Sequence, residues 1–127
     1  MRLVVDGMNV IGSRPDGWWR DRAGARRRLV AELAGLAASG DEVTVVFDGR
    51  PGAGEEAAAE AVGVTARFAP GGPNAADHAI AALVSTLAEP GDVTVVTSDA
   101  ALADAVRGHG ARVEGVTAFR ARLGSPP

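Results

Sequence analysis

Four aspartates stand where a short apolar run ends or where a predicted helix begins. Three of them follow apolar runs, namely Asp6, Asp48 and Asp99. The fourth, Asp77, lies in the first turn of a predicted helix. Ligands of an open parallel α/β sheet bind outside the carboxyl ends of its strands, so we expect the four carboxylates at one edge. Packed carboxylates repel one another unless a cation compensates them. Oxygen ligands without cysteine favour Mg²⁺ or Mn²⁺, so the sequence predicts a site for one of these ions.

Each of these aspartates also has a purely structural interpretation. Asp6 and Asp48 are each followed by glycine, and Asp-Gly is an ordinary turn signal. Asp77 lies three residues after Asn74, a candidate N-cap, where a carboxylate favours the helix N-terminus. Asp99 precedes a predicted helix and is suited to cap it. The functional interpretation therefore depends on the four aspartates together.

The composition excludes several kinds of active site. The chain of 127 residues has no cysteine, which excludes a disulfide partner, a thiolate zinc site and a cysteine nucleophile. All 13 residues counted as lysine or arginine are arginine, which excludes Schiff-base chemistry and a P-loop lysine. Nucleophile-elbow and GxGxxG motifs are absent, which disfavours acyl hydrolases and dinucleotide-dependent dehydrogenases. Aspartates holding a divalent ion suit phosphoryl chemistry, because the ion lowers the pKa of a bound water and stabilises charge on phosphate.

The charge is unevenly distributed along the chain. The formal net charge is -3, but the segment Arg14–Arg28 has six arginines and two aspartates, so it carries +4 and the remainder -7. Mild overall acidity argues against a generic nucleic-acid coat, whereas the basic segment suits an anionic substrate. Trp18 and Trp19 lie in this segment and either stack on bases or pack against the sheet. We expect at least one of them to pack, because indoles are mostly buried.

Two hydrophobic periodicities alternate along the chain. Short apolar runs predict strands buried on both faces, strongly at residues 3–5, 43–47 and 93–97 and more weakly at 64–69 and 111–114. Apolar stripes at helical spacing predict helices over residues 21–38 and 75–88. Two further helices are expected at 55–62 and 100–107, and a terminal helical turn at 117–123. Alternating strands and helices indicate a parallel α/β sheet with right-handed crossovers. We expect one domain over residues 1–123 and a loose tail at 124–127.

No segment has the pattern of a targeting sequence or a membrane span. A signal peptide needs about 7–15 consecutive apolar residues and a membrane helix about 20. The first apolar run ends at Asp6 after a few residues. We therefore expect a cytoplasmic protein without a membrane partner.

Four short motifs resemble those of one known family. In chain order they are Val-Asp-Gly-Met-Asn-Val-Ile at 5–11, Val-Phe-Asp-Gly-Arg at 46–50, Ala-Asp at 76–77 and Val-Thr-Ser-Asp at 96–99. Their order and spacing resemble the YacP-like branch of NYN domains, within the PIN-like nucleases, from Leu3 to Leu123. The resemblance implies a single Rossmann-like domain with strand order 3-2-1-4-5 and a metal-dependent ribonuclease site.

The resemblance also implies roles for individual residues. The implied metal ligands are Asp6, Asp77 and Asp99. Asp48 would support these ligands or act as an additional one, and Asn9 would orient the first loop or a ligand carboxylate. Thr97 and Ser98 would bond to a bound water or phosphate.

Two positions depart from the family pattern. His78 stands where the family usually has a second acidic residue, and Ala100 occupies a position that is often polar or acidic in related nucleases. The site is therefore expected to hold fewer carboxylates than active relatives do. We favour His78 as a surface helix histidine; the alternative is a Mn²⁺ ligand or a group that acts on a proton.

Arginines are expected to bind the RNA backbone through bidentate contacts. Two candidates lie near strand ends, Arg14 and Arg50. Two others lie one helical turn apart, Arg22 and Arg26. We therefore predict a Mg²⁺- or Mn²⁺-dependent ribonuclease whose partner is RNA. The alternatives are a catalytically decayed RNA-binding module and a small-molecule phosphohydrolase, for which Met8 interrupts the expected Asp-x-Asp pair. A homodimer and a partner associated with RNA or the ribosome stay open.

Overall fold

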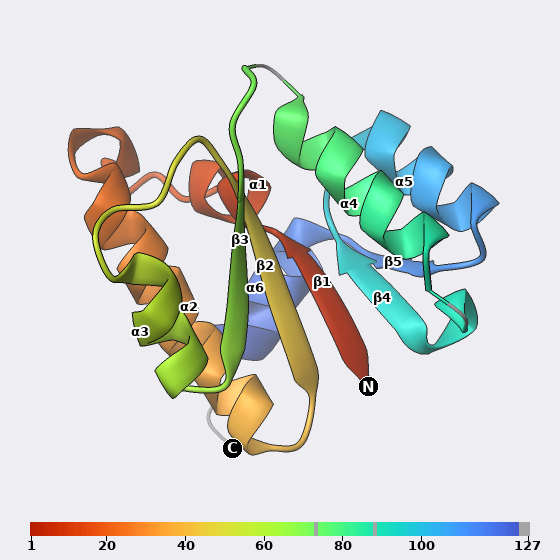
Figure 1. The fold of residues 1–127 in the computed structure, drawn as a ribbon, viewed down its shortest axis with the longest axis horizontal. Helices are drawn as coiled ribbons and strands as arrows, with labels where there is room; N and C mark the ends of the chain where they lie inside the picture. Colours follow the sequence, from red (N-terminus) through yellow and green to blue (C-terminus); the bar gives the residue numbers. More distant parts are fainter. Residues whose placement is uncertain (73, 88, 125–127) are drawn as a thin grey trace.

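The strands of the protein form a parallel sheet in the order β3-β2-β1-β4-β5 (Figure 1). The computed structural model describes residues 1–72, 74–87 and 89–124. The five strands are β1 (Arg2–Asp6), β2 (Glu42–Asp48), β3 (Val64–Ala69), β4 (Val93–Val96) and β5 (Arg112–Glu114). The predicted α/β class and the strand order 3-2-1-4-5 are confirmed.

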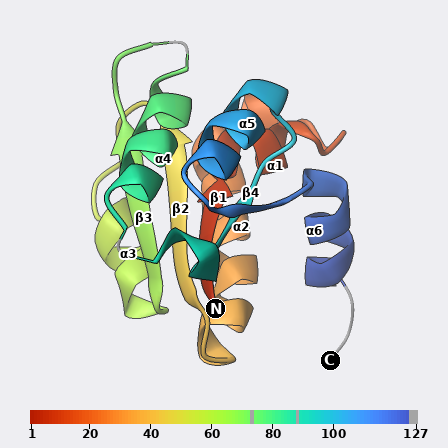
Figure 2. The same cartoon turned by 90° about the vertical axis from the view of Figure 1, so that its right-hand side faces the viewer.

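Helices connect the strands and cover both faces of the sheet. The α-helices are α1 (Gly7–Gly12), α2 (Arg22–Ala38), α3 (Glu55–Ala61), α4 (Ala75–Ser85), α5 (Ala100–Gly108) and α6 (Val116–Gly124). Two short 3-10 helices, η1 (Trp18–Arg20) and η2 (Pro90–Asp92), lie between them. Figures 1 and 2 show α4 and α5 on one side of the sheet and α2 and α3 on the other. None of the described helices is long and apolar enough to cross a membrane.

Successive residues of β1 enter two different hydrophobic cores, because strand side chains alternate between the faces of a sheet. Leu3 and Val5 pack into the core that also contains Leu29 of α2 and Phe119 of α6. Val4 packs into the second core, formed with α4 and α5. The strand has polar residues only at its ends because both of its faces are covered. This double burial explains the continuous apolar runs in the sequence.

The structure begins a helix where the sequence predicts a turn. Gly7 leads directly into α1, so the turn expected at Asp6-Gly7 is wrong. A Cβ atom at Gly7 would lie 2.5 Å from two ring carbons of Phe47, so only glycine lets α1 approach β2 this closely. Gly49 is different: its φ of 90° lies in the left-handed region that favours glycine, as expected of a turn after β2.

Two predicted boundaries near the ends of helices need correction. The helix expected over 75–88 ends at Ser85. The Ser85 and Thr86 hydroxyls donate to carbonyls three residues earlier, each at 2.7 Å, and such contacts compete with a continuing helix. Residue 88 lies outside the described residues. Of the tail expected at 124–127, Gly124 belongs to α6, and residues 125–127 lie outside the described residues.

Candidate functional site

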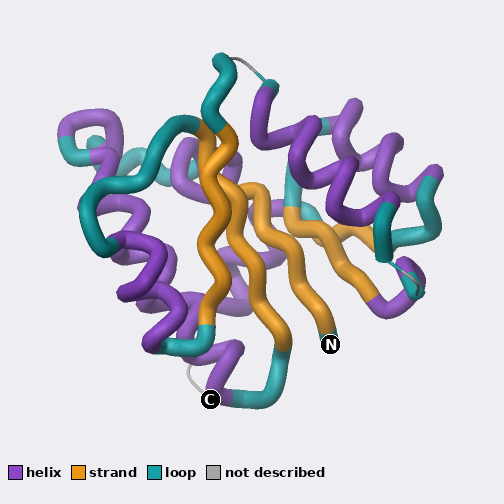
Figure 3. Tube along the Cα trace, viewed as in Figure 1, coloured by secondary structure: helices purple, strands orange, loops and turns teal. Residues whose placement is uncertain are grey.

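The predicted aspartates lie at the carboxyl edge of the sheet, where β1 and β2 end and α4 and α5 begin. Asp6 is the last residue of β1 and Asp48 the last of β2. Asp77 lies in the first turn of α4, and Asp99 is the N-cap of α5. Figure 3 shows the loops after β2 and β3 leaving the end of the sheet from which α4 starts. Four segments far apart in sequence thus bring carboxylates to the same edge.

Asp6 is the buried member of the cluster. Its side chain is 4% exposed, and Thr97 Oγ1 donates a hydrogen bond to Asp6 Oδ2 at 3.0 Å. The pKa of Asp6 is raised to about 6, mainly by burial and also by the charges of Asp77 and Asp48, against the opposing effect of the Thr97 hydroxyl and the Asn9 backbone. Asp6 is therefore the carboxyl whose ionised form is most costly in the absence of a cation.

Asp77 is repelled by two of the other carboxylates. Burial raises the pKa of Asp77, the charges of Asp99 and Asp48 raise it further, and His78 lowers it. Together with the repulsion between Asp6 and Asp77, these effects show that the four carboxylates lie within electrostatic reach of one another. In the part of the chain that the structure describes, none of the four forms an ion pair with arginine.

Two of the aspartates also hold helix N-termini. Asp48 Oδ1 accepts a hydrogen bond from the backbone N–H of Ala76 at 3.1 Å, and Asp99 Oδ1 accepts one from Leu102 at 2.9 Å. Asn74 is the N-cap residue of α4, as expected, but its φ is 66° and its side chain makes no capping hydrogen bond. Asp48 performs this capping from the neighbouring strand. Each of these carboxylates uses one oxygen for the cap, and the other has no hydrogen-bond partner among the described residues.

Asn9 and the residues after β4 connect the loops of the site. Asn9 Oδ1 accepts a hydrogen bond from the Ser98 backbone N–H at 2.8 Å. Ser98 Oγ in turn accepts from the backbone N–H of Val116 at 2.9 Å, at the start of α6. Thr97 is 1% exposed, and its hydroxyl, which donates to Asp6, also accepts from the Asp99 N–H at 3.1 Å. These contacts fix the β4–α5 connection against α1 and α6.

The carboxyl edge is hollowed on both sides of the sheet. A cleft of about 250 Å³ between α4 and α5 is lined by Asp77, His78 and Asp99, among others. A second cleft of about 410 Å³ is lined by residues of α1, α6 and the β4–α5 connection, including Asn9 and Ser98. The exposed His78 therefore faces the same hollow as two of the aspartates.

The donor set suits a hard divalent ion. All four candidate ligands are carboxylates, and burial together with repulsion from neighbouring carboxylates raises the pKa of Asp6 and of Asp77. In the described ranges, however, no three acidic or histidine side chains are already arranged around a common point. The residues thus fit Mg²⁺ or Mn²⁺ in chemistry.

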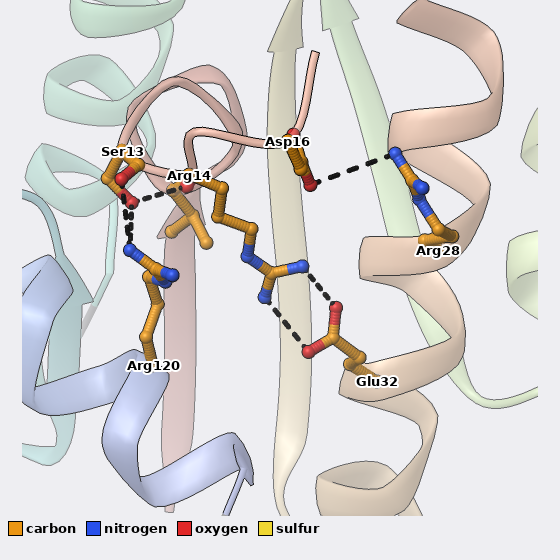
Figure 4. Close-up of polar contacts among 7 residues, drawn as sticks. Ser13, Arg14, Asp16, Arg28, Glu32 and Arg120 are labelled. Carbon is orange, nitrogen blue, oxygen red and sulfur yellow. Dashed lines mark hydrogen bonds and ion pairs between the residues drawn. The ribbon is translucent and has the colours of Figure 1, made fainter. Parts of the chain in front are cut away.

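Two of the four arginines expected to bind RNA hold carboxylates of the protein. Arg14 binds both oxygens of Glu32, at 2.7 and 2.9 Å (Figure 4). Arg26 binds both oxygens of Glu55, at 2.5 and 3.0 Å, and its guanidinium lies 5.6 Å from the ring centroid of Phe68. These arginines therefore join α2 to the loop after α1 and to α3.

The other two expected arginines have no carboxylate partner among the described residues. Arg22 is exposed, and its guanidinium lies 5.4 Å from the ring centroid of Trp18. Arg50 is exposed in the loop two residues after Asp48. The expectation that at least one tryptophan packs is confirmed, because Trp18 is half-buried against the first hydrophobic core.

The sequence did not point to Arg120 as part of this region. Arg120 of α6 donates to the carbonyl oxygen of Ser13 at 3.0 Å and to Ser13 Oγ at 3.3 Å (Figure 4). It thereby fastens the end of α1 to α6. No local pattern could reveal this contact, because the two residues are 107 positions apart.

Comparison with known proteins agrees with this architecture. The family model of the YacP-like NYN domain matches residues 3–125. The W164L mutant of Rae1 (YacP) from Bacillus subtilis is 26% identical with a TM-score of 0.76, over 96% of this chain and 74% of that one. A second Rae1 (YacP) structure from Bacillus subtilis, at 24% identity, shares the fold with a TM-score of 0.70 over 97% and 73% of the two chains. No curated protein matches the sequence. The chain belongs to the family of YacP-like NYN domains.

Proposed function

We propose that this protein is a Mg²⁺- or Mn²⁺-dependent ribonuclease. The observation that carries the proposal is the gathering of four carboxylates at one edge of the sheet, with the pKa of Asp6 and of Asp77 raised and no arginine pairing with the cluster in the described residues. Carboxylates gathered in this way repel one another, and a bound divalent cation compensates that repulsion. Membership of a nuclease-like family supports the same conclusion.

The proposed ligands are Asp6, Asp77 and Asp99, with Asp48 as an additional or supporting carboxylate. A bound Mg²⁺ or Mn²⁺ supplies an activated water and neutralises charge on the scissile phosphate. The Thr97 hydroxyl keeps Asp6 Oδ2 in place, and Asn9 holds the loop that carries Asp99. Both are positioning residues, because their hydrogen bonds are made within the protein.

The RNA backbone is proposed to contact Arg50 and Arg22. Both guanidinium groups are exposed and lack a carboxylate partner in the described part of the chain. Arg14 and Arg26, by contrast, are each held by a bidentate ion pair, so an RNA phosphate would have to compete with Glu32 or Glu55. We therefore assign phosphate binding to the first pair and a structural task to the second.

The test is cleavage of single-stranded and structured RNA by the whole chain with Mn²⁺, with EDTA, and with Asp6→Asn. Cleavage should require Mn²⁺ and disappear in the variant. Asp104→Asn is a matched control, because its side chain is 84% exposed on α5 outside the cluster, and it should cleave as the wild type does. Circular dichroism establishes that both variants fold. Cleavage that persists in EDTA and in Asp6→Asn would overturn the proposal.

A second candidate is an RNA-binding module without catalysis. It is favoured by His78 in place of an acidic residue and by the absence, among the described residues, of three ligands already grouped around one point. Calorimetric titration with Mn²⁺ separates the two functions. Saturable Mn²⁺ binding that Asp77→Asn abolishes supports the ribonuclease, whereas salt-sensitive RNA binding without any Mn²⁺ binding supports the second candidate.

A further inference from the structure

The two tryptophans form an aromatic surface that the proposed catalytic site does not use. Trp18 and Trp19 open η1, and their rings are nearly perpendicular, at 87°, with centroids 6.0 Å apart. Trp18 is half-buried against the core, whereas Trp19 is 56% exposed. Tryptophan is highly buried on average in folded proteins, so the exposed indole of Trp19 beside the half-buried Trp18 is an unusual aromatic face available to a ligand.

Two arginines extend this surface without being neutralised. The guanidinium of Arg20 lies 5.9 Å from the ring centroid of Trp19, and that of Arg22 lies 5.4 Å from that of Trp18. Neither forms an ion pair within the described residues.

The acidic side chains of the same segment are engaged elsewhere. Asp21 Oδ1 accepts from the Gly24 N–H at 2.9 Å, and Asp16 lies 3.9 Å from Arg28 (Figure 4). The tryptophan pair thus lies beside two arginines without an ion-pair partner among the described residues, while Asp21 is held at the start of α2 by its capping hydrogen bond. Aromatic faces beside exposed cations are the means by which proteins bind single-stranded nucleic acids.

The aromatic surface lies one short helix away from the candidate metal site. Asp6 directly precedes α1, and Gly12 ends it, so the six residues of α1 span about 9 Å. A Cβ atom at Gly12 would lie 4.0 Å from the Trp18 ring, which places Trp18 against the end of this helix. The cleft lined by Asn9, Gly12 and Ser98 runs along α1 and the residues that follow β4. An RNA strand that crosses the carboxyl edge of the sheet at Asp6 can therefore continue to the two tryptophans.

We infer that Trp18, Trp19, Arg20 and Arg22 form a binding surface for an unpaired stretch of RNA, with a base stacked on Trp19 and backbone phosphates next to the two arginines. The inference rests on the proposed function in taking RNA as the ligand. It adds a selection for single-stranded substrate, because the bases of a duplex are already stacked and offer no free face to Trp19.

The fluorescence of the protein reports on this surface alone, because the chain contains two tryptophans and no tyrosine. The whole chain is titrated in EDTA, where cleavage does not interfere, with a short oligouridylate. Saturable quenching of the tryptophan emission is expected. The same oligouridylate annealed to oligoadenylate should leave the emission nearly unchanged.

Substitutions at Trp19 test the contribution of stacking. The affinity is measured from the anisotropy of a fluorescein-labelled oligouridylate. Trp19→Ala should weaken binding roughly tenfold, whereas Trp19→Phe, which keeps an aromatic face, should retain most of it. Val62→Ala is the control, because Val62 is also exposed, at 46%, but precedes β3 at the opposite edge of the sheet. It should bind as the wild type does.

Several outcomes separate this inference from the ribonuclease proposal. Unchanged emission at saturating oligouridylate, or binding by Trp19→Ala within about twofold of the wild type, overturns the inference. If the wild type cleaves RNA without any change in tryptophan emission, the proposed RNA-binding surface is wrong and the ribonuclease proposal is supported. If the emission is quenched and Trp19→Ala binds weakly in a chain that does not cleave with Mn²⁺, the surface is supported and the ribonuclease fails.

Discussion

Thr97 Oγ1 lies 3.0 Å from Asp6 Oδ2 and donates to it, although the two residues are 91 positions apart. The same oxygen accepts the backbone N–H of Asp99 at 3.1 Å. One buried hydroxyl therefore connects the carboxylate that ends β1 with the backbone of the residue that caps α5. Through this connection the distance between two proposed metal ligands is determined by a residue that is itself no ligand.

Removal of this hydroxyl should weaken the fold and raise the pKa of Asp6 further. Thr97→Val keeps the shape but leaves the Asp99 N–H without its acceptor and Asp6 without its donor. We expect a loss of about 1–3 kcal/mol in the free energy of unfolding. Urea denaturation at pH 7 in EDTA measures it, and Thr97→Ser should recover most of the loss. Equal stability of Thr97→Val and the wild type would contradict the connection.

The contribution of Asp6 to the stability of the metal-free protein should fall as the pH rises from about 4 to above 6. The folded-state pKa of Asp6 is raised from 3.8 to about 6, so in this interval the folded protein keeps a proton that the unfolded chain has released. Rising pH then favours the unfolded chain, by up to about 3 kcal/mol once Asp6 is ionised. Asp6→Asn lacks this titration and should be the more stable protein at neutral pH.

The difference in unfolding free energy between the wild type and Asp6→Asn isolates this effect, because the other carboxylates titrate in both proteins. Urea denaturation in EDTA at several pH values between 4 and 8 gives the difference at each pH. A difference that does not change across this interval would show that Asp6 is ionised in the folded protein at the same pH as in the unfolded chain.

The strands followed from the sequence because the signal that specifies them is local. A run such as Val4-Val5 is apolar at consecutive positions, and the structure buries the two side chains in different cores. The carboxyl edge was then predictable, since parallel strands all end there. The helix α1 was not, because Gly7 begins it by packing against Phe47, forty positions away. Its six residues are too few to show a helical stripe of their own.

The partners of the polar side chains could not be derived from the sequence for a similar reason. Asp48 holds the N–H of Ala76 from 28 positions away, whereas Asn74, the N-cap residue that the local pattern indicated, makes no capping hydrogen bond with its side chain. Arg26 is likewise held by Glu55, 29 positions along the chain. A sequence shows that a charge is present, but only the fold decides which groups it meets.

Arg26→Ala should reduce stability, whereas Arg50→Ala should reduce RNA affinity. The side chains of Arg26 and Glu55 are only 14% and 12% exposed, so removing the arginine leaves a half-desolvated carboxylate and costs about 2–4 kcal/mol. The exposed Arg50 should change stability by less than about 0.5 kcal/mol. Its loss should weaken RNA binding and reduce the salt dependence by about one phosphate contact.

Thermal unfolding and fluorescence anisotropy over a series of salt concentrations measure the two effects separately. Each variant serves as the control for the other, because both substitutions remove one arginine and change the net charge by the same amount. An Arg26→Ala protein that keeps its stability and loses RNA affinity would reverse the two assignments.

Asp77→Asn should be more stable than the wild type without metal and less stable than the wild type with Mn²⁺. In EDTA the substitution relieves the repulsion of Asp77 by Asp99 and Asp48 and should raise the melting temperature. With Mn²⁺ at about one hundred times its dissociation constant, the wild type should gain about 2.7 kcal/mol, or roughly 10 °C, whereas the variant should gain little. The order of the two melting temperatures therefore inverts on addition of the metal.

Asp104→Asn, which changes an exposed carboxylate of α5, should follow the wild type in both conditions. A variant that stays above the wild type with Mn²⁺ present would show that Asp77 repels its neighbours without binding the ion, and the proposed ligand set would lose this residue.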